Sequence, residues 1–357
     1  MSTKKFQGAF TALITPFTAE GRIDWRALEL NIAFQIRNGI HGLVPCGTTG
    51  ESPALPWSDH RVLMQRTHAL IDNKILTIAG TGSNSTEEAL QASREAAAVG
   101  FDGILLIEPY YNKPASAQIR LFYHHIIANE VAEINPDMTV IPYIIPGRTC
   151  CKMEPVDLAL LAEACFNVRA VKEATGDLNN MTLTRQLLGP NFSILSGDDS
   201  LTATMMNPTN GNQIHGNGVI SVISNIAPGA ISQMVNLFLD GRSDSALTIA
   251  DQLMPLFNLV GVSVETTRTY HDQTYTVTDK FPNPGPIKTM MAGLGMDSGV
   301  FRPPLGLMAA PAVLKIREVL RRIWVDNAWI LGPIEEHYRI NVHRRLENDA
   351  IWERLSL

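Results

Sequence analysis

The sequence is poor in the features that mark several large classes of protein. Only four of its 357 residues are cysteine, and none has the CxxC spacing of a zinc or redox site. A disulfide framework is not expected, and reduced thiols in a cytoplasm-like compartment are the simpler interpretation. No apolar run is long enough to span a bilayer, and the N-terminal MSTKKFQGAF lacks the apolar core of a signal peptide. We therefore expect a cytoplasmic protein without a membrane partner.

Charge is also scarce. Charged residues make up 18% of the chain, the net charge is -6, and no run of Lys and Arg occurs. This balance gives no support to nucleic-acid binding. An anionic substrate must then be bound by local positive groups, because the net negative charge of the protein does not attract it. Apolar residues make up 45% of the chain, which is enough for a sizeable core.

The chain has no GxGxxG motif, but short apolar segments alternate with capped helical stretches in the pattern of parallel βα units. The expected strands are residues 9–15, 42–46, 75–80, 103–107, 139–143, 168–173, 193–197 and 218–221. Eight such units within the first 240 residues fit a closed (β/α)8 barrel, a TIM barrel. An open doubly wound sheet usually has fewer strands and a Gly-rich first turn.

Capping residues set the boundaries of two expected helices. Asp24 precedes a helix that should stop at Gly39, and Ser85 precedes one that should stop at Gly100. Ser85 and Glu88 have the spacing of a capping box.

Beyond Asp240 the alternation stops. We expect residues 1–240 to form the barrel and residues 241–357 to form a C-terminal helical region packed on it, with helices at 245–261, 287–294 and 310–324. Residues 262–282 read as an inserted ordered loop or short hairpin. The tail, residues 325–357, either docks on the barrel or reaches a neighbouring subunit.

Functional residues of such a barrel lie at the C-terminal ends of its strands, and a lysine lies at one of them. Lys172 follows Val168, Ala170 and Val171 in an apolar strand. Burial would lower its pKa from about 10.4 and free the amine as a nucleophile. Alternatively, its head reaches solvent. Tyr143, one strand away, either relays protons or is a packed barrel tyrosine.

Other strand ends carry groups that suit anions. Thr48 and Thr49 lie in GlyThrThrGlyGlu, which either offers N–H and hydroxyl groups to a carboxylate or is a simple turn. Arg148 either grips a second carboxylate or lies on the surface. Asp198 and Asp199 favour a turn and helix cap over a metal site, so no metal is expected.

Together these segments resemble the dihydrodipicolinate synthase / N-acetylneuraminate lyase family of class I aldolase-like barrels. The resemblance covers about residues 8–324. It rests on GlyThrThrGlyGluSer at 47–52, TyrIleIleProGlyArgThr at 143–149, ValLysGluAla at 171–174 and GlyAsnGlyValIleSerVal at 216–222. The family commonly has Asn where this chain has Ile144. Strand alternation should turn Ile144 away from the Tyr143 side chain, so we expect altered packing and not lost catalysis.

The resemblance implies a lyase that forms a Schiff base with pyruvate. Lys172 would form the imine, and no metal or organic cofactor is needed because the imine is the electron sink. Thr48, Tyr143 and Tyr111 would relay protons, with Tyr111 supplied across a dimer interface. We therefore expect a homo-oligomer, either a dimer or a tetramer.

The resemblance also implies two substrates and an effector. The residues expected at the substrates are Thr48, Thr49, Arg148, Gly197 and Ile220. Arg148 would bind the carboxylate of L-aspartate 4-semialdehyde, so the product would be 4-hydroxy-tetrahydrodipicolinate, on the diaminopimelate route to lysine. The residues expected to bind lysine as a feedback inhibitor are Ser52, Trp57, His60, Asn84, Glu88 and Tyr110. Glu88 suits an ammonium group, although it is otherwise only the capping-box partner of Ser85.

Two other functions stay open. The same imine chemistry serves aldolases of 2-keto-3-deoxy sugar acids or 4-hydroxy-2-oxoglutarate, and Arg148 argues against them. A non-catalytic barrel that binds lysine or pyruvate belongs to a different class. Borohydride trapping of pyruvate on Lys172 distinguishes imine chemistry from simple binding.

Overall fold

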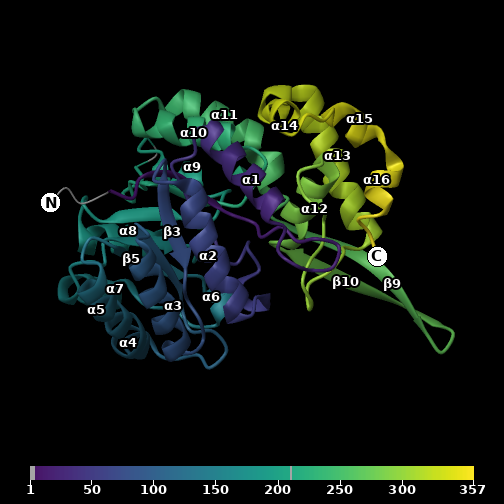
Figure 1. Ribbon diagram of the computed structural model, residues 1–357. Helices are drawn as coiled ribbons and strands as arrows, with labels where there is room; N and C mark the ends of the chain where they lie inside the picture. The colour runs from purple at the N-terminus through teal and green to yellow at the C-terminus, as the bar shows by residue number, and fades with distance from the viewer. Residues whose placement is uncertain (1–4, 210) are drawn as a thin grey trace.

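Eight parallel strands close into a barrel in the computed structural model of this chain, which describes residues 5–209 and 211–357 (Figure 1). Residues 1–4 and 210, within the span expected to form the barrel, lie outside the described residues. The strands are β1 (Gly8–Ala12), β2 (Gly42–Val44), β3 (Leu76–Gly80), β4 (Gly103–Ile107), β5 (Thr139–Ile144), β6 (Ala170–Glu173), β7 (Ser193–Ser196) and β8 (Gly218–Ser221). Each strand pairs with the next, and β8 closes on β1. The expected (β/α)8 barrel is confirmed.

The first strand ends earlier than the sequence predicts. The Leu13 amide still donates to the Val44 carbonyl of β2 at 3.1 Å, but after it the chain bonds to loops: the Ile14 amide donates to Asn225 Oδ1 at 3.2 Å, and the Thr15 hydroxyl donates to the Gly50 carbonyl at 2.7 Å. These residues are as apolar or β-branched as a strand, so the sequence pattern does not reveal the change of partner.

A layer of helices surrounds the barrel (Figure 1). The helices are α1 (Trp25–Arg37), α2 (Trp57–Ile71), α3 (Thr86–Val99), α4 (Ser116–Ile119), η2 (Arg120–His124), α5 (His125–Ile134), α6 (Pro146–Thr149), α7 (Pro155–Ala164), α8 (Leu178–Leu188), α9 (Thr202–Met206) and α10 (Pro228–Leu239). Two 3-10 turns, η1 (Ser52–Ala54) and η3 (Ile223–Asn225), follow strand ends. No helix in the described part of the chain is both long and apolar enough to cross a membrane.

The caps form as expected, but the capping box does not. Asp24 Oδ1 accepts from the Ala27 amide at 3.0 Å, and Ser85 Oγ accepts from the Glu88 amide at 3.4 Å. The second bond of the box is missing, because the Glu88 carboxylate accepts from Ser83 Oγ at 2.6 Å. The predicted capping box is therefore wrong in its second half, and the Glu88 carboxylate is held away from the Ser85 amide.

Apolar side chains pack in two layers, one inside the barrel and one between the barrel and its helices. Tyr143 belongs to the inner cluster and Ile144 to the outer one, each at most 5% exposed. Alternation along β5 thus sends the two side chains to opposite faces. The expectation that Ile144 is turned away from the Tyr143 side chain is confirmed.

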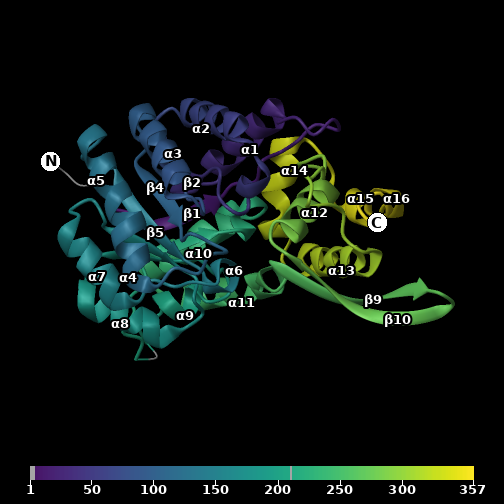
Figure 2. The ribbon, with the colours of Figure 1, turned by 90° about the horizontal axis from the view of Figure 1, so that it is seen from below.

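The C-terminal region lies against one side of the barrel (Figure 1). Its elements are α11 (Ser243–Phe257), β9 (Gly261–Tyr270), β10 (Gln273–Pro282), α12 (Gly285–Leu294), α13 (Ala310–Asp326), η4 (Ala328–Ile330), α14 (Gly332–Tyr338), α15 (Val342–Glu347) and α16 (Asp349–Glu353). The helix expected over 245–261 ends at Phe257, and the inserted segment is a hairpin, β9–β10, that projects from the body (Figure 2).

The tail docks on this chain's own body. Trp352 is buried, and its ring N–H donates to the Arg345 carbonyl at 3.1 Å. The Tyr338 hydroxyl donates to Asn31 Oδ1 of α1 at 2.7 Å. The tail therefore contacts a helix of the barrel layer within the same chain.

Candidate active site

A cavity of about 340 Å³ opens at the C-terminal ends of the strands, where barrel enzymes carry their chemistry. The expected site residues that line it are Thr48, Thr49, Tyr143, Arg148, Lys172 and Gly197. Ile220 is buried in the barrel interior, and Val222, two residues later, lines the cavity. A Cβ on Gly197 would lie 3.1 Å from Lys172 Cε, so glycine leaves room for the lysine stem.

Lys172 is buried at this mouth. It is 5% exposed, and its Nζ lies 4.1 Å from the centroid of the Tyr143 ring, its register partner on β5. Burial lowers the pKa of Lys172 to about 7, Asp199 opposes this shift, and Arg148 adds to it. A substantial share of the amine is therefore neutral near pH 7 and able to attack a carbonyl.

Tyr143 is buried beside that amine. Burial raises its pKa to about 12, while the nearby Arg148 charge and a hydrogen bond with the Thr48 side chain oppose the rise. The hydroxyl therefore stays protonated at neutral pH and is connected to Thr48. Strands β5 and β6 and the loop after β2 thus bring together three of the four predicted catalytic residues, Tyr143, Lys172 and Thr48.

Asn283, the residue after β10, bonds to two of the expected substrate-binding residues, and the sequence analysis did not predict it. Its side-chain N–H donates to Thr49 Oγ1 at 2.9 Å, and its backbone carbonyl accepts from Arg148 Nη2 at 2.9 Å. The PheProAsnProGlyPro segment stands out as rigid, but no spacing connects it with the barrel mouth.

A buried ion pair supports the Thr48–Thr49 loop from behind, and it too was missed. Lys288 Nζ lies 2.6 Å from Glu51 Oε1, and both side chains are fully buried. Lys288 also donates to the carbonyls of Thr15 at 3.1 Å and Val300 at 2.6 Å. Buried charges persist when paired and hydrogen-bonded in this way, so α12 anchors the loop that carries both threonines.

The two aspartates after β7 are used for structure. Asp198 Oδ1 accepts from the Ser200 amide at 3.0 Å, and Asp199 Oδ2 accepts from the amides of Val222 and Ile223 at 2.9 and 3.2 Å. The predicted turn is confirmed, but the predicted helix cap is wrong, because α9 begins after Leu201 and no side chain caps it. Within residues 5–209 and 211–357, no group of three His, Cys, Asp or Glu side chains is placed to hold a metal ion.

A second cavity of about 320 Å³ adjoins the first and shares Thr48, Tyr143 and Arg148 with it. Four of the expected lysine-binding residues line it, namely Ser52, Trp57, Glu88 and Tyr110. Burial raises the pKa of Tyr110, and the Glu88 charge adds to the rise.

The other two predicted lysine-binding residues lie outside the walls of this cavity. His60 lies behind Trp57 with ring centroids 4.7 Å apart, and burial lowers its pKa to about 4, so it is neutral. Asn84 is exposed and does not line the cavity.

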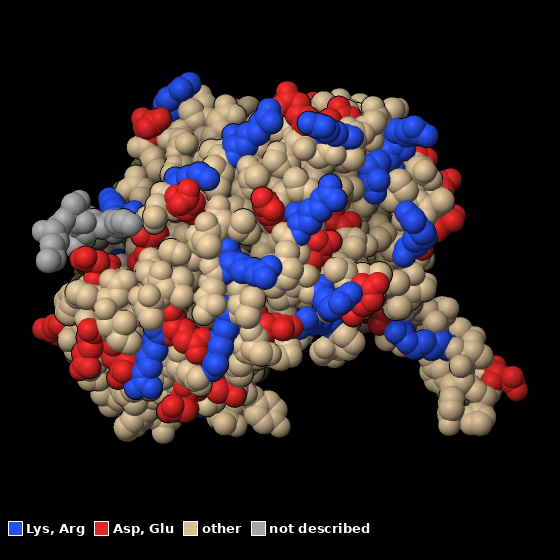
Figure 3. All heavy atoms as spheres, viewed as in Figure 1, with Lys and Arg blue, Asp and Glu red and all other residues tan. Residues whose placement is uncertain are grey.

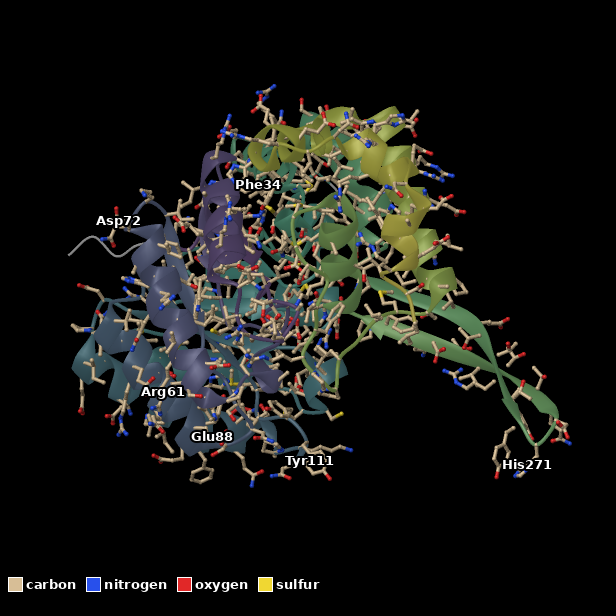
Figure 4. The ribbon with its side chains drawn as sticks, turned by 45° about the vertical axis from the view of Figure 1, so that its right-hand side comes forward. Phe34, Arg61, Asp72, Glu88, Tyr111 and His271 are labelled. Carbon is tan, nitrogen blue, oxygen red and sulfur yellow. The ribbon has the colours of Figure 1, made fainter. Side chains whose placement is uncertain are left out.

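Tyr111 is the one relay residue that this chain does not bring to Lys172. It is 84% exposed, has a φ of 81°, and lies at the outer edge of the barrel (Figure 4). Its neighbour Tyr110 points into the second cavity instead. Within one chain, Tyr110 therefore lines a cavity, whereas Tyr111 lies on the exposed surface.

Imine formation with pyruvate is expected to slow as the pH falls below about 7, because the protonated form of Lys172 is not nucleophilic. Well below this pH the rate should fall about tenfold per unit. Asp199→Asn removes a charge that raises the lysine pKa, so the acid limb should shift to lower pH. Cyanoborohydride trapping at several pH values measures this. A limb centred near pH 10, or one that Asp199→Asn leaves in place, would contradict the assigned environment.

Comparison with known proteins agrees with this geometry. The model of the dihydrodipicolinate synthetase family matches residues 5–323. The 4-hydroxy-tetrahydrodipicolinate synthase of Syntrophobacter fumaroxidans is 39% identical over 317 residues, which is 88% of this chain and 98% of that protein.

Two solved structures are similar throughout the barrel. The dihydrodipicolinate synthase of Aquifex aeolicus has a TM-score of 0.78 and 36% identity over 89% of this chain and 98% of that one. The enzyme of Cyanidioschyzon merolae with lysine bound has a TM-score of 0.77 and 34% identity over 90% and 99%. Helices α14–α16 lie beyond the residues that the family model matches.

Proposed function

Because the chain belongs to the dihydrodipicolinate synthetase family, we propose that it condenses pyruvate with L-aspartate 4-semialdehyde to give 4-hydroxy-tetrahydrodipicolinate. This makes it a lyase of lysine biosynthesis. The observation that carries the proposal is the buried Lys172 at the barrel mouth, with its pKa lowered to about 7 and Tyr143 beside it.

The chemistry follows from these groups. Lys172 Nζ attacks C2 of pyruvate, and loss of water leaves an imine. A proton then leaves the methyl carbon, and the resulting enamine carbon bonds to the aldehyde carbon of the acceptor. The acceptor's own amine finally adds to the imine carbon, which closes the ring and releases the lysine. Tyr143 and Thr48 carry protons to and from the nitrogen and oxygen atoms in these steps.

The cavity offers separate positions to the two substrates. Thr48 and Thr49 hold the pyruvate carboxylate beside Lys172. Arg148, held by the Asn283 carbonyl, binds the carboxylate of the acceptor aldehyde. In a chain whose net charge is -6, this guanidinium supplies the local attraction that an anionic acceptor needs.

Pyruvate consumption by the purified protein tests the proposal. The protein is offered L-aspartate 4-semialdehyde and, separately, sugar aldehydes and glyoxylate. Fast turnover only with the semialdehyde supports the assignment. Turnover only with another aldehyde would retain the imine chemistry but refute the role given to Arg148. Absence of a trapped pyruvate adduct would instead indicate a non-catalytic barrel that only binds its ligand.

The exposed Tyr111 completes the relay of a second subunit in this proposal. It is 84% exposed at the rim of the barrel, where it suits a contact between copies. The working unit is then at least a dimer, and a tetramer would be built from such dimers.

The second cavity is the proposed site of lysine feedback. Its Glu88 carboxylate suits the ammonium groups of lysine, and the Tyr110 hydroxyl suits the carboxylate. Because Thr48 and Tyr143 line both cavities, an effector there contacts the walls of the active site directly.

Glu88→Ala is expected to weaken lysine binding about 10- to 100-fold, since a charge-assisted hydrogen bond contributes about 1.5–3 kcal/mol. Glu87→Ala is the matched control, because Glu87 is an exposed carboxylate in the same first turn of α3. Calorimetry with millimolar lysine, with and without pyruvate, measures both. No heat with the unmodified protein would remove the lysine site, and equal weakening by both variants would indicate only a general charge effect.

A further inference from the structure

The hairpin β9–β10, residues 261–282, forms an arm that stands off the body (Figures 1 and 2). Ten residue pairs run from Gly261–Pro282 at the root to Tyr270–Gln273 at the tip, which corresponds to about 33 Å of ribbon. The tip residues His271 and Asp272 have φ values of 47° and 62°, as a two-residue hairpin turn requires. The arm is thus fully formed as a ribbon, and no third strand from the described residues pairs with it.

The register divides the arm into two unlike faces. The aromatic face carries Val262, Val264, Thr266, Arg268, Tyr270, Gln273, Tyr275, Val277, Asp279 and Phe281. The threonine face carries Ser263, Glu265, Thr267, Thr269, Thr274, Thr276, Thr278 and Lys280. All large apolar side chains of the arm outside its ends therefore lie on one face. That is the pattern of a ribbon with one covered side and one solvated side.

Only the root of the aromatic face is covered within the chain. Val262 is 2% exposed, and Val264 and Phe281 pack against the core. Farther out on the same face, Val277 is 36% exposed, Tyr275 is 47% exposed and Tyr270 is 68% exposed. The charged residues of this face, Arg268 and Asp279, bond to each other and so need no partner from another molecule.

Arg268 bonds both carboxylate oxygens of Asp279 at 2.8 and 2.9 Å, which neutralises the charges of this face internally. Tyrosine is enriched in protein interfaces, because it buries a large ring and keeps a polar tip. An isolated two-stranded ribbon is only marginally stable in water. The outer aromatic face is thus built to be covered.

We propose that the aromatic face of the arm docks on a second copy of this chain. The outer part of the ribbon, from Thr266 to Tyr270, offers roughly 170 Å² of flat area, about 17 Å by 10 Å. One arm against an unrelated partner would bury only about 340 Å² in total, far below the 1,200 Å² or so of a stable interface. Two arms exchanged across a twofold axis bury about twice as much, and the barrel surface between them supplies the rest.

The position of the arm on the molecule is consistent with a second copy of this chain as the docking partner. A hollow separates the arm from the lower part of the barrel (Figure 3). Figure 4 shows the labelled Tyr111 at the bottom of the barrel and His271 at the tip of the arm, both on the lower side of the molecule in that view. A copy placed there meets the arm and the rim near Tyr111 together. This step rests on the proposed function, which puts Tyr111 into a second subunit's site.

The root of the arm lies at the active-site cavity. Gly261 and Asn283, at the two ends of the hairpin, line the active-site cavity, and Asn283 bonds to Thr49 and Arg148. A second copy that binds the arm therefore also stabilises one wall of the active-site cavity.

Photocrosslinking tests the contact. Tyr275 is replaced by p-benzoylphenylalanine, and subunits labelled with ¹⁴N and ¹⁵N are mixed before irradiation. Crosslinked peptides that join one isotope to the other are expected on tryptic mass spectrometry. Crosslinks confined to peptides of a single chain would overturn the proposal.

A pair of adjacent variants tests the face. Val277→Lys places a charge on the aromatic face and Thr276→Lys places the same charge on the threonine face of the same strand. Sedimentation should show the dissociation constant of the oligomer raised at least about tenfold by the first and less than about threefold by the second. Equal effects, or an unmodified protein that is monomeric at micromolar concentration, would overturn the proposal.

A complementation assay separates this proposal from the proposed function. Tyr111→Phe subunits are mixed with Lys172→Ala subunits, and recovered turnover reports a relay shared between chains. Isotope-mixed crosslinks without recovered turnover support the arm contact and reject the shared relay. Recovered turnover without such crosslinks keeps the relay and overturns the arm contact.

Discussion

Replacement of Lys172 by alanine is expected to abolish both pyruvate trapping and turnover. The variant lacks the only amine that lies inside the barrel-mouth cavity among the described residues, so no imine and no enamine can form. The loss of kcat should be at least about 10⁴-fold, because removal of a covalent catalyst takes away the whole pathway and not one contact. Mass spectrometry after borohydride treatment with pyruvate measures trapping, and pyruvate consumption measures turnover.

Lys152→Ala is the matched control for this variant. Lys152 is a partly exposed lysine whose Nζ lies 2.9 Å from Glu154, outside the lining of the cavity. It should keep full trapping and turnover. A pyruvate adduct that survives in Lys172→Ala would move the nucleophile to another lysine. Loss of the adduct in the control as well would point to a folding defect.

The parts of the site that were predictable lie at strand ends. Strands β4 and β8 match the expected bounds to the residue, because glycine and polar residues delimit short apolar runs there. Once the strands are placed, the barrel closure puts Thr48, Tyr143 and Lys172 at one mouth. Their convergence follows from the order of the elements and needs no knowledge of side-chain packing.

The parts that were not predictable depend on distant contacts. Asn283 bonds to a threonine 234 positions earlier, and Lys288 pairs with a glutamate 237 positions earlier. No local pattern carries such information, because each residue also suits an ordinary helix start or surface. The environment of Glu88 shows the same limit at short range. Sequence spacing predicts that the Glu88 carboxylate bonds to the Ser85 amide, but in the structure it accepts from the Ser83 hydroxyl.

The arm shows how far alternation can be interpreted. ValSerValGluThrThrArgThrTyr alternates too weakly to decide between a loop and a hairpin. The turn at His271 and Asp272 fixes the register, and the register then separates the apolar side chains from the threonines. Amphipathicity became visible only after the pairing was known.

Arg148→Ala is expected to keep pyruvate trapping and to lose turnover with L-aspartate 4-semialdehyde. The guanidinium is proposed to bind the acceptor carboxylate and not pyruvate, so kcat/KM for the acceptor should fall about 10²- to 10³-fold, the equivalent of about 3–4 kcal/mol. The KM of pyruvate should change less than about threefold. Steady-state kinetics with each substrate varied in turn, together with trapping, measures the split.

The pH at which Arg148→Ala is measured decides how it is interpreted. The Arg148 charge lowers the pKa of Lys172, so its removal should raise that pKa and shift the acid limb of imine formation upward. Kinetics at about pH 8.5 and above therefore separate a lost acceptor contact from a protonated lysine. Arg148→Lys retains a charge there but not the two-pronged geometry, and should recover the pH profile more fully than acceptor binding. If acceptor kcat/KM returned to normal once the pH was raised, Arg148 would act only on Lys172, and the choice of aspartate semialdehyde as acceptor would lose its main support.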